Sequence, residues 1–348
     1  MSVSWIIAFE IGAIAFAVSL AVTGFSRLGG LGDIPDHRSS HKHITPTAGG
    51  IGIMAGIGAA LAVATLFHAN IFFERPGSVE RLATFLSLVF AMSFLGLVDD
   101  RFVLASKIKF PIMLLLSAFA CSVIGPVMTL PFGPGFIELP LWVGLAGSIL
   151  WVFTVINTVN FSDGINGMFA TTLGIASAGL CALALLVDAP ITALLSGVLT
   201  ASLMGFLPYN FRRTAAIFSG DCGSLGASFI YAGAVLFLIY EQPNMNLVYA
   251  GPLLILPILA DILITLVRKP GLGIGFLAPH NKHMFQRWAR YWRRHRPVTL
   301  IYGLATAGMV FWVLRSFQKG SLGATSDVAL FSVLFIGLYV ALSRWLPD

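Results

Sequence analysis

The chain has 348 residues, of which 57% are hydrophobic and only 10% are charged. This composition excludes an ordinary soluble globular domain and predicts a protein that crosses a membrane many times. The formal net charge of +6 would suit a nucleic-acid-binding protein, but in so apolar a chain a basic excess more often reports orientation in the bilayer and contact with anionic lipids. We therefore expect membrane lipids, and no nucleic acid, among its partners.

Apolar runs long enough to span a bilayer follow one another along the chain, and they predict an all-α, polytopic integral membrane protein with about 11 transmembrane helices. The runs cover approximately residues 4–25, 49–67, 82–98, 109–125, 139–157, 168–187, 190–207, 224–240, 249–267, 298–315 and 327–346. No long polar insert divides them, so residues 1–348 are expected to form a single membrane-embedded domain. The first run has no basic residue before it and Arg27 after it, which predicts a retained helix with a periplasmic N-terminus.

The distribution of basic residues supports this orientation. With the N-terminus outside, seventeen Lys and Arg residues fall in predicted cytoplasmic loops and four in periplasmic ones. Such a bias is typical of the positive-inside rule. Asp99, Asp100, Asp163 and Asp221 lie on the same cytoplasmic face, in three separate loops. They can therefore converge on a single cytoplasmic site.

A polar stretch between the fifth and sixth apolar runs, Asn157 to Met168, reads N-T-V-N-F-S-D-G-I-N-G-M. Asn157, Asn160, Asp163 and Asn166 are unfavourable at a membrane boundary, and the glycines allow the backbone to lie close to a bound group. The pattern favours a loop that grips a ligand. The alternative is a polar turn, which Asn, Asp and Gly suit equally well.

Two adjacent aspartates, Asp99 and Asp100, end the third apolar run. They concentrate negative charge where lipid headgroups begin, which is unfavourable unless a cation is held there. The alternative is a plain helix end in the headgroup layer. Lys107 and Lys109 follow, and they suit either a lipid phosphate or ordinary flanking charge.

Asp221 opens the eighth apolar run in the stretch S-G-D-C-G-S. The neighbouring glycines permit close backbone approach, and the helix N-terminus favours phosphate, so Asp221 can be a magnesium ligand. As an alternative, Asp221 can simply be the helix N-cap. Asp261 lies inside the ninth apolar run, and an intramembrane carboxylate is a functional candidate.

Two basic stretches complete the set of candidates. R-S-S-H at Arg38 to His41 suits an anionic group, and P-H-N-K-H-M-F-Q-R, which contains His280, His283 and Arg287, is the start of the most basic segment. The spacing of its apolar and basic residues predicts an interfacial amphipathic helix. Because the His-x-x-His pair has no third ligand nearby, contact with a diphosphate or lipid headgroup is favoured over a metal site.

Taken together, these stretches resemble the superfamily of polyprenyl-phosphate N-acetylaminosugar-1-phosphate transferases, of the MraY, WecA and WbpL type. The resemblance runs from about Arg38 to Arg296. Its motifs here are R-S-S-H at 38–41, D-D at 99–100, N-x-x-N-F-x-D-G-x-N-G at 157–167, G-D-x-G-S at 220–224 and the His-rich segment at 280–287. That last segment is closer to the WbpL-like branch, which initiates O-antigen synthesis, than to the H-x-H-H form of many members.

The resemblance implies transfer of a sugar-1-phosphate from a UDP-N-acetylamino sugar, of the UDP-GlcNAc, UDP-FucNAc or UDP-QuiNAc type, to undecaprenyl phosphate with release of UMP. It implies Mg²⁺ (or Mn²⁺) as the cofactor, Asp221 as its ligand with Asp163 as a further candidate, the bacterial inner (cytoplasmic) membrane as the location, and a homodimer by family analogy. Asp99, Asp100 and Asp163 would be catalytic. The implied substrate-binding residues are Arg38, His41, Lys107, Lys109, Asn157, Asn160, Asn166, His280, His283 and Arg287.

Several alternatives stay open at this point. The donor can be the larger UDP-MurNAc-pentapeptide used by MraY-like enzymes, and the transfer can be direct or pass through an intermediate on Asp99 or Asp100. A secondary transporter or a structural membrane subunit would have the same hydropathy. A transporter is disfavoured because the carboxylates are predicted at one surface and no inverted repeat is apparent.

Overall fold

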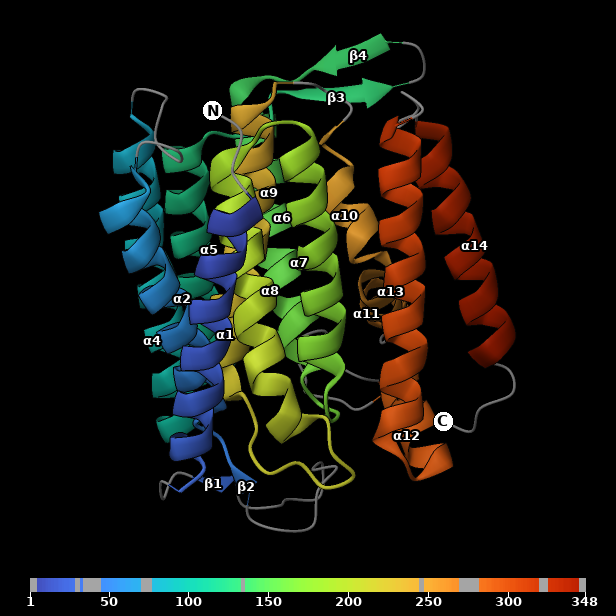
Figure 1. Ribbon diagram of the computed structural model, residues 1–348. Helices are drawn as coiled ribbons and strands as arrows, with labels where there is room; N and C mark the ends of the chain where they lie inside the picture. Colours follow the sequence, from blue (N-terminus) through green and yellow to red (C-terminus); the bar gives the residue numbers. More distant parts are fainter. Residues whose placement is uncertain are drawn as a thin grey trace.

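The computed structural model describes residues 5–28, 32–33, 45–69, 77–132, 135–243, 247–268, 282–318 and 325–343. The expected binding residues Arg38, His41 and His280 lie outside these ranges. The described part is a helical bundle (Figure 1) built from α1 (Trp5–Ser26), α2 (Gly49–Phe67), α4 (Ser78–Phe102), α5 (Ser106–Ile124), α6 (Leu141–Ser162), α7 (Met168–Leu186), α8 (Pro190–Asn210), α9 (Gly220–Glu241), α10 (Ala250–Leu254), α11 (Leu256–Arg268), α12 (Met284–Trp292), α13 (His295–Gln318) and α14 (Thr325–Ser343).

Two short antiparallel hairpins, absent from the sequence prediction, lie at opposite ends of the bundle (Figure 1). One pairs β1 (Gly32–Asp33) with β2 (Thr45–Pro46), and the other pairs β3 (Thr129–Phe132) with β4 (Gly135–Glu138). Both are outside the apolar runs, so the expectation of an all-α membrane domain is confirmed.

Nine of the described helices are long and apolar enough to cross a membrane: α1, α2, α4, α5, α6, α7, α8, α9 and α13. The prediction of one continuous helix over residues 249–267 is wrong, because the chain breaks at Ile255 between α10 and α11. Pro257 explains the break, since proline fits the first turn of a new helix but clashes with the carbonyl of the preceding turn inside a longer one.

Two helices extend further toward the predicted site than their hydropathy indicated. The sequence placed the ends of the third and fifth apolar runs at residues 98 and 157, whereas α4 continues to Phe102 and α6 to Ser162. At a membrane boundary, intrahelical hydrogen bonds satisfy the backbone without help from water, which favours continuing the helix through polar residues. Asn157 and Asn160 therefore lie on the last turns of α6 and not in a loop.

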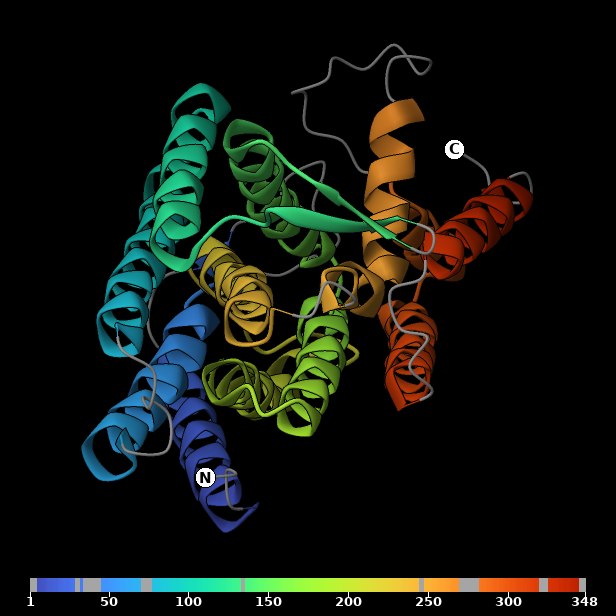
Figure 2. The same cartoon turned by 90° about the horizontal axis from the view of Figure 1, so that it is seen from above.

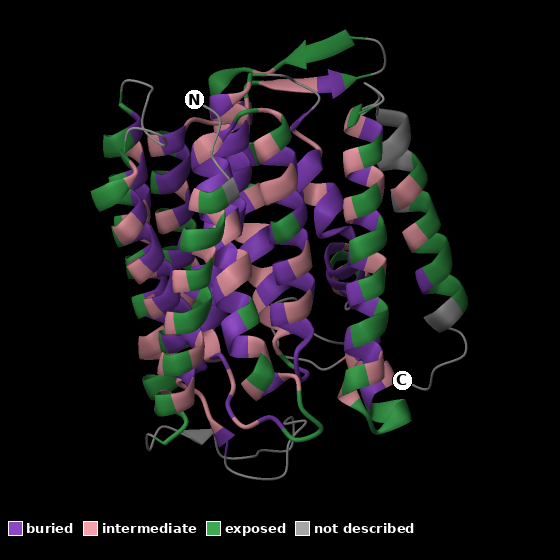
Figure 3. Ribbon diagram, viewed as in Figure 1, coloured by how far each residue is buried: buried purple, intermediate pink, exposed green. Residues whose placement is uncertain are grey.

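The long helix α9 forms the centre of the bundle. It packs against α2, α4, α5, α6, α7 and α8, and the view from above shows it surrounded by other helices (Figure 2). Nearly all its residues are buried, and Figure 3 shows that buried residues gather in the middle of the bundle. Small residues make this packing tight: a side chain at Gly50 of α2 would collide with the backbone of Gly223. The N-terminus of α9 is thus held rigidly.

The outer surface of the bundle is apolar. Phe94 of α4, Leu150 of α6 and Phe311 of α13 are 65%, 62% and 68% exposed. Large side chains exposed in this number on a soluble protein would cause aggregation, whereas lipid tails solvate them. With its long apolar helices, this surface identifies a multi-pass membrane protein.

Candidate active site

One end of the bundle brings Asp99, Lys109, Asn160 and Asp221 into direct contact. The ammonium of Lys109 donates a hydrogen bond to Asp99 Oδ2 at 2.7 Å and another to Asp221 Oδ2. Asn160 Nδ2 donates to Asp221 Oδ1 at 2.8 Å. The four residues come from α4, α5, α6 and α9, so helix ends that are far apart in sequence build one cluster, as the sequence predicted for its carboxylates.

The two adjacent aspartates of α4 have different partners. Asp99 accepts hydrogen bonds from Lys109 and from the backbone N–H of Leu104, the latter at 2.6 Å. Asp100 accepts from the backbone N–H groups of Asp221 and Cys222 at 2.8 and 3.1 Å. Asp100 thereby caps the N-terminus of α9 from another helix, where a negative charge is favoured by the unpaired amides.

This arrangement excludes the helix N-cap role for the Asp221 side chain. The side chain of Asp221 does not cap its own helix, because Asp100 does so, and the Asp221 carboxylate is directed to Lys109 and Asn160 instead. Gly220 makes room for the arrangement. It has a φ of 65°, which favours glycine, and a Cβ there would collide with the Asp100 carboxylate.

Asp163 follows the last residue of α6 and joins the cluster through Ser219, whose hydroxyl donates to Asp163 Oδ2. Burial away from water raises the pKa of the Asp163 carboxyl to about 8. The hydrogen bond from Ser219 lowers this pKa, and the negative charges of Asp221 and Asp100 raise it further. A carboxyl in this state gains most from a cation that would stabilise its ionised form.

The loop after Asp163 is held in place by a separate set of hydrogen bonds. Asn166 donates its amide to the Arg212 carbonyl at 3.0 Å, and its backbone N–H donates to His295 Nδ1 at 3.2 Å. The backbone N–H of Gly167 donates to Asn210 Oδ1 at 2.6 Å. In this structure Asn166 therefore shapes the loop that carries Asp163.

Two other predicted binding residues do not join the carboxylate cluster. Asn157 donates to the Phe153 carbonyl of its own helix at 2.7 Å. Lys107 is exposed, whereas the side chain of Lys109, on the same helix, is only 12% exposed. The structure therefore separates two lysines that the sequence treated alike.

Helix α12 lies against this end of the bundle, and over Met284–Trp292 it confirms an amphipathic helix in the basic segment that runs from Pro279 to Arg296. His283, just before it, stacks on Phe161 of α6 with ring centroids 5.7 Å apart. A Cβ on Gly164 would lie 3.2 Å from Gln286 Nε2. His283 and Arg287 are both buried. The start of α12 therefore lies beside the loop that begins at Asp163, and Arg287 follows Gln286 along the helix.

Asp261, the intramembrane carboxylate, does not reach the carboxylate cluster. It accepts hydrogen bonds from the backbone N–H groups of Met284 and Phe285 at 2.9 and 3.1 Å, and from the Tyr302 hydroxyl at 2.7 Å. Its observed role is to cap α12.

The chemistry of the cluster fits a divalent cation. Within the described ranges, no three His, Cys, Asp or Glu side chains already surround one point closely enough to hold a metal. However, Asp99 and Asp221 hold the ammonium of Lys109 between them. Asp100 and Asp163 lie beside the same helix start, through the backbone of Asp221 and the hydroxyl of Ser219. Carboxylate and amide oxygens are the donors that Mg²⁺ prefers, and these side chains supply them.

Sequence reasoning missed several residues that position the site. Ser219 binds Asp163, Ser224 accepts a hydrogen bond from Asn160 at 2.9 Å, and Asn210 and His295 hold the backbone at 166–167. Ser219 and Ser224 flank Asp221 in the G-D motif, so their position was a signal. Asn210 and His295 lie in no recognised motif and become visible only in three dimensions.

Comparison with known proteins identifies a family and several relatives. A family model described as "Glycosyl transferase family 4" matches residues 82–239. The chain is 27% identical over 316 residues to a probable undecaprenyl-phosphate N-acetylglucosaminyl 1-phosphate transferase of Bacillus subtilis, covering 88% of this chain and 82% of that protein. It is 26% identical over 369 residues to a decaprenyl-phosphate N-acetylglucosaminephosphotransferase of Mycolicibacterium smegmatis, covering 97% and 89%.

A third relative is a phospho-N-acetylmuramoyl-pentapeptide-transferase of Caldicellulosiruptor bescii, 31% identical over 261 residues that cover 71% of this chain and 76% of that protein. The family match begins in α4 and ends in α9, and so includes every member of the cluster formed by Asp99, Lys109, Asn160 and Asp221. The chain therefore belongs to glycosyl transferase family 4, the superfamily of polyprenyl-phosphate N-acetylaminosugar-1-phosphate transferases.

Proposed function

We propose that this protein transfers N-acetylaminosugar-1-phosphate from a UDP-sugar to undecaprenyl phosphate. A phosphate oxygen of the lipid attacks the β-phosphorus of the donor, the bond from that phosphorus to the bridging oxygen breaks, and UMP leaves with that oxygen. The product is undecaprenyl-diphosphate-sugar. The observation that carries the proposal is the cluster of Asp99, Lys109, Asn160 and Asp221 at one end of a membrane bundle, where a lipid phosphate and a soluble nucleotide meet.

Each part of the site has a task in this reaction. Both substrates are anionic, so the site has to offset their mutual repulsion and hold them in line. The Lys109 ammonium supplies positive charge within reach of Asp99 and Asp221. Asp99 or Asp100 orients the acceptor phosphate or takes its proton, and direct attack requires no enzyme-bound intermediate because the acceptor is already an anion. His283, directly before α12, and Arg287 on α12 contact the donor diphosphate.

Mg²⁺ is the proposed cofactor, with Asp221 as its ligand and Asp163 as a second oxygen donor. When bound, Mg²⁺ would neutralise charge on the diphosphate oxygens. Asn160 holds the Asp221 carboxylate in place through its bond to Oδ1, and Ser219 does the same for Asp163.

The raised pKa of Asp163 gives this assignment a pH dependence. Because the Asp163 pKa is about 8 without metal, the carboxyl is largely protonated at pH 6, and a cation has to displace that proton. We expect Mg²⁺ affinity to rise about tenfold per pH unit below pH 8 and to level off above it. Calorimetric titration of purified protein with MgCl₂ at several pH values measures this, and Asp163→Asn should make the slope shallower. An unchanged slope in that variant would exclude Asp163 as a ligand.

UDP-GlcNAc is the first donor to test, because two of the relatives described above are named for N-acetylglucosamine. The form of the segment at 280–287 instead favours the O-antigen-initiating branch and donors such as UDP-FucNAc or UDP-QuiNAc. We place the reaction in the bacterial inner membrane, at the start of a cell-surface polysaccharide.

The second candidate is an MraY-like transfer of phospho-MurNAc-pentapeptide. The relative from Caldicellulosiruptor bescii favours it. A secondary transporter fits less well, since the carboxylate cluster lies at one end of the helices and not at mid-membrane.

The test is UMP release by purified protein in detergent with MgCl₂ and undecaprenyl phosphate, across UDP-GlcNAc, UDP-GalNAc, UDP-FucNAc, UDP-QuiNAc and UDP-MurNAc-pentapeptide. We expect lipid-dependent release with one N-acetylamino sugar donor. Omission of the lipid is the matched control. Release with UDP-MurNAc-pentapeptide alone would establish the second candidate, and folded protein that is silent with every donor would contradict the proposal.

A further inference from the structure

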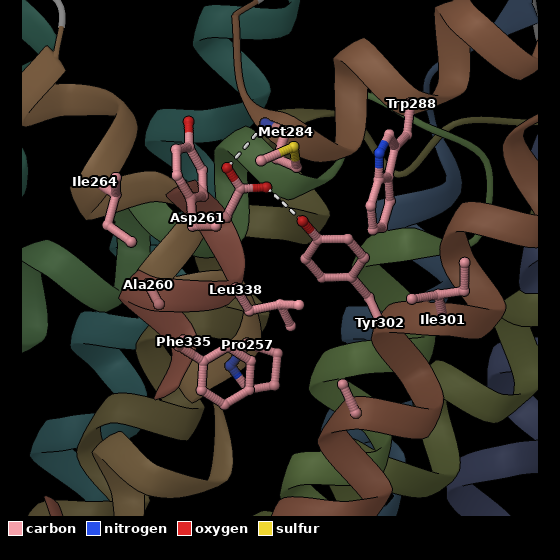
Figure 4. Close-up of a pocket in the computed structure, with 12 residues that line it drawn as sticks. Pro257, Ala260, Asp261, Ile264, Met284, Trp288, Ile301, Tyr302, Phe335 and Leu338 are labelled. Atoms are coloured by element: carbon pink, nitrogen blue, oxygen red, sulfur yellow. Dashed lines mark hydrogen bonds between the residues drawn. The ribbon is translucent and has the colours of Figure 1, made fainter. Parts of the chain in front are cut away.

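A buried carboxylate attaches α12 to the membrane bundle. Asp261 is only 3% exposed, and it accepts from the first two backbone amides of α12, from Tyr302 of α13, and from Thr265 Oγ1 at 3.3 Å. Figure 4 shows the carboxylate between Met284 and Tyr302, with both hydrogen bonds dashed. A charged cap at a helix N-terminus is among the stronger hydrogen-bonding arrangements.

The packing around this attachment is uneven: Phe285 is fully buried and contacts the ring of Tyr302, whereas a cavity adjoins Met284 and Trp288. A cavity of about 80 Å³ is lined by side chains of α11, α12, α13 and α14, including Asp261, Met284, Trp288 and Tyr302 (Figure 4). Side chains that face a cavity lose packing partners on that side. The capping bonds therefore hold α12 together with the packing of Phe285, and they matter most on the side that faces the cavity.

The orientation of α12 matters because it determines where His283 and Arg287 lie. His283 lies directly before Met284, and its ring is parallel to that of Phe285 with centroids 5.5 Å apart. The same ring also stacks on Phe161 of α6, two residues before Asp163. The capped turn is thus joined to the loop that begins at Asp163 through one stack of rings.

We propose that Asp261 is a positioning residue for the transfer reaction: by capping α12, it fixes His283 and Arg287 at the side of the Asp163 loop. The inference rests on the proposed function for its consequence but not for its geometry. Loss of the cap should shift α12 and weaken contact with the donor diphosphate, while leaving the cluster of Asp99, Lys109, Asn160 and Asp221 unchanged.

A matched control is found at the other end of the bundle. Glu241, at the end of α9, is 2% exposed and caps α8 by accepting from the backbone N–H groups of Ile191 and Thr192 at 2.7 and 2.9 Å. It is also a buried carboxylate that caps a helix from another helix, but it lies on the opposite side of the bundle from the site. Glu241→Gln therefore reports the general effect of weakening such a cap.

The experiment compares Asp261→Asn, Asp261→Ala and Glu241→Gln with wild type in detergent. Hydrogen–deuterium exchange of the peptide covering residues 282–290 reports the cap directly. We expect exchange there to be about tenfold faster in Asp261→Ala, smaller acceleration in Asp261→Asn, which keeps one acceptor oxygen, and no change in Glu241→Gln. Normal exchange of this peptide in Asp261→Ala would overturn the proposal.

Kinetics supply the second readout. For Asp261→Ala we expect a KM for the UDP-sugar raised about tenfold and a kcat lowered by about tenfold to a hundredfold, with an unchanged KM for undecaprenyl phosphate. Glu241→Gln should lower Tm and leave both KM values as in wild type. If the Asp261 variants lower only Tm, as we expect of Glu241→Gln, then Asp261 has a purely structural role and the inference is overturned. If wild type itself transfers no sugar-phosphate, the proposed function fails. The hydrogen–deuterium exchange result still decides whether Asp261 caps α12.

Discussion

Asp221→Asn is expected to lower sugar-phosphate transfer by about two to three orders of magnitude while the protein still folds. The replacement keeps the shape of the side chain and one acceptor oxygen for Asn160 or Lys109, but it removes the negative charge that would bind Mg²⁺. The N-terminus of α9 should remain intact, because Asp100 and not Asp221 caps it. The measurement is the initial rate of UMP release with the donor found in the panel, together with Tm.

Asp188→Asn is the matched control for this variant. Asp188 is exposed, lies between α7 and α8 at the other end of the bundle, and has a φ of 56°, which Asn tolerates as well as Asp. The same loss of one carboxylate should leave transfer unchanged there. Near-normal transfer by folded Asp221→Asn would contradict the metal assignment.

Lys109→Met is expected to lower transfer by about a hundredfold, whereas Lys107→Met changes it by less than about threefold. Lys109 lies between Asp99 and Asp221, and the exposure of its side chain and of theirs is 12%, 14% and 24%. Without the ammonium, two poorly hydrated carboxylates face each other, and the site loses positive charge that would otherwise meet the lipid phosphate. Lys107 is exposed on the same helix, so it controls for charge and for helix propensity.

Steady-state rates with undecaprenyl phosphate as the varied substrate test this pair. Lys109→Arg should recover little activity, because the guanidinium is larger and planar and cannot take the place of an ammonium between two carboxylates. An equal, small effect of Lys107→Met and Lys109→Met would remove Lys109 from the site. Large and equal losses of activity in the two variants would show that the reaction needs positive charge at this end of α5 in general, and not the buried position of Lys109.

Much of the fold follows from properties that are local in sequence. A span of apolar residues is hydrophobic whatever lies beside it, so α2 (Gly49–Phe67) was predicted with the same bounds and α7 and α8 to within a few residues. The convergence of Asp99, Asp163 and Asp221 was also predictable, because the number of spans between them determines that all three face one side of the membrane. The break at Ile255 was missed because hydropathy does not register the effect of Pro257 on the backbone.

The partners of each carboxylate could not be predicted in this way. Asp99 and Asp100 are neighbours in sequence, yet one binds Lys109 and the other caps α9, 121 residues further along the chain. The position of Asp261 inside an apolar run indicated a functional role, but only the structure shows that its carboxylate accepts from the first backbone amides of α12. The sequence established that the protein is a membrane transferase by family and which carboxylates share a face. Only the tertiary structure decided which side chain or helix N-terminus each carboxylate binds, because that depends on side-chain direction and on packing between helices distant in sequence.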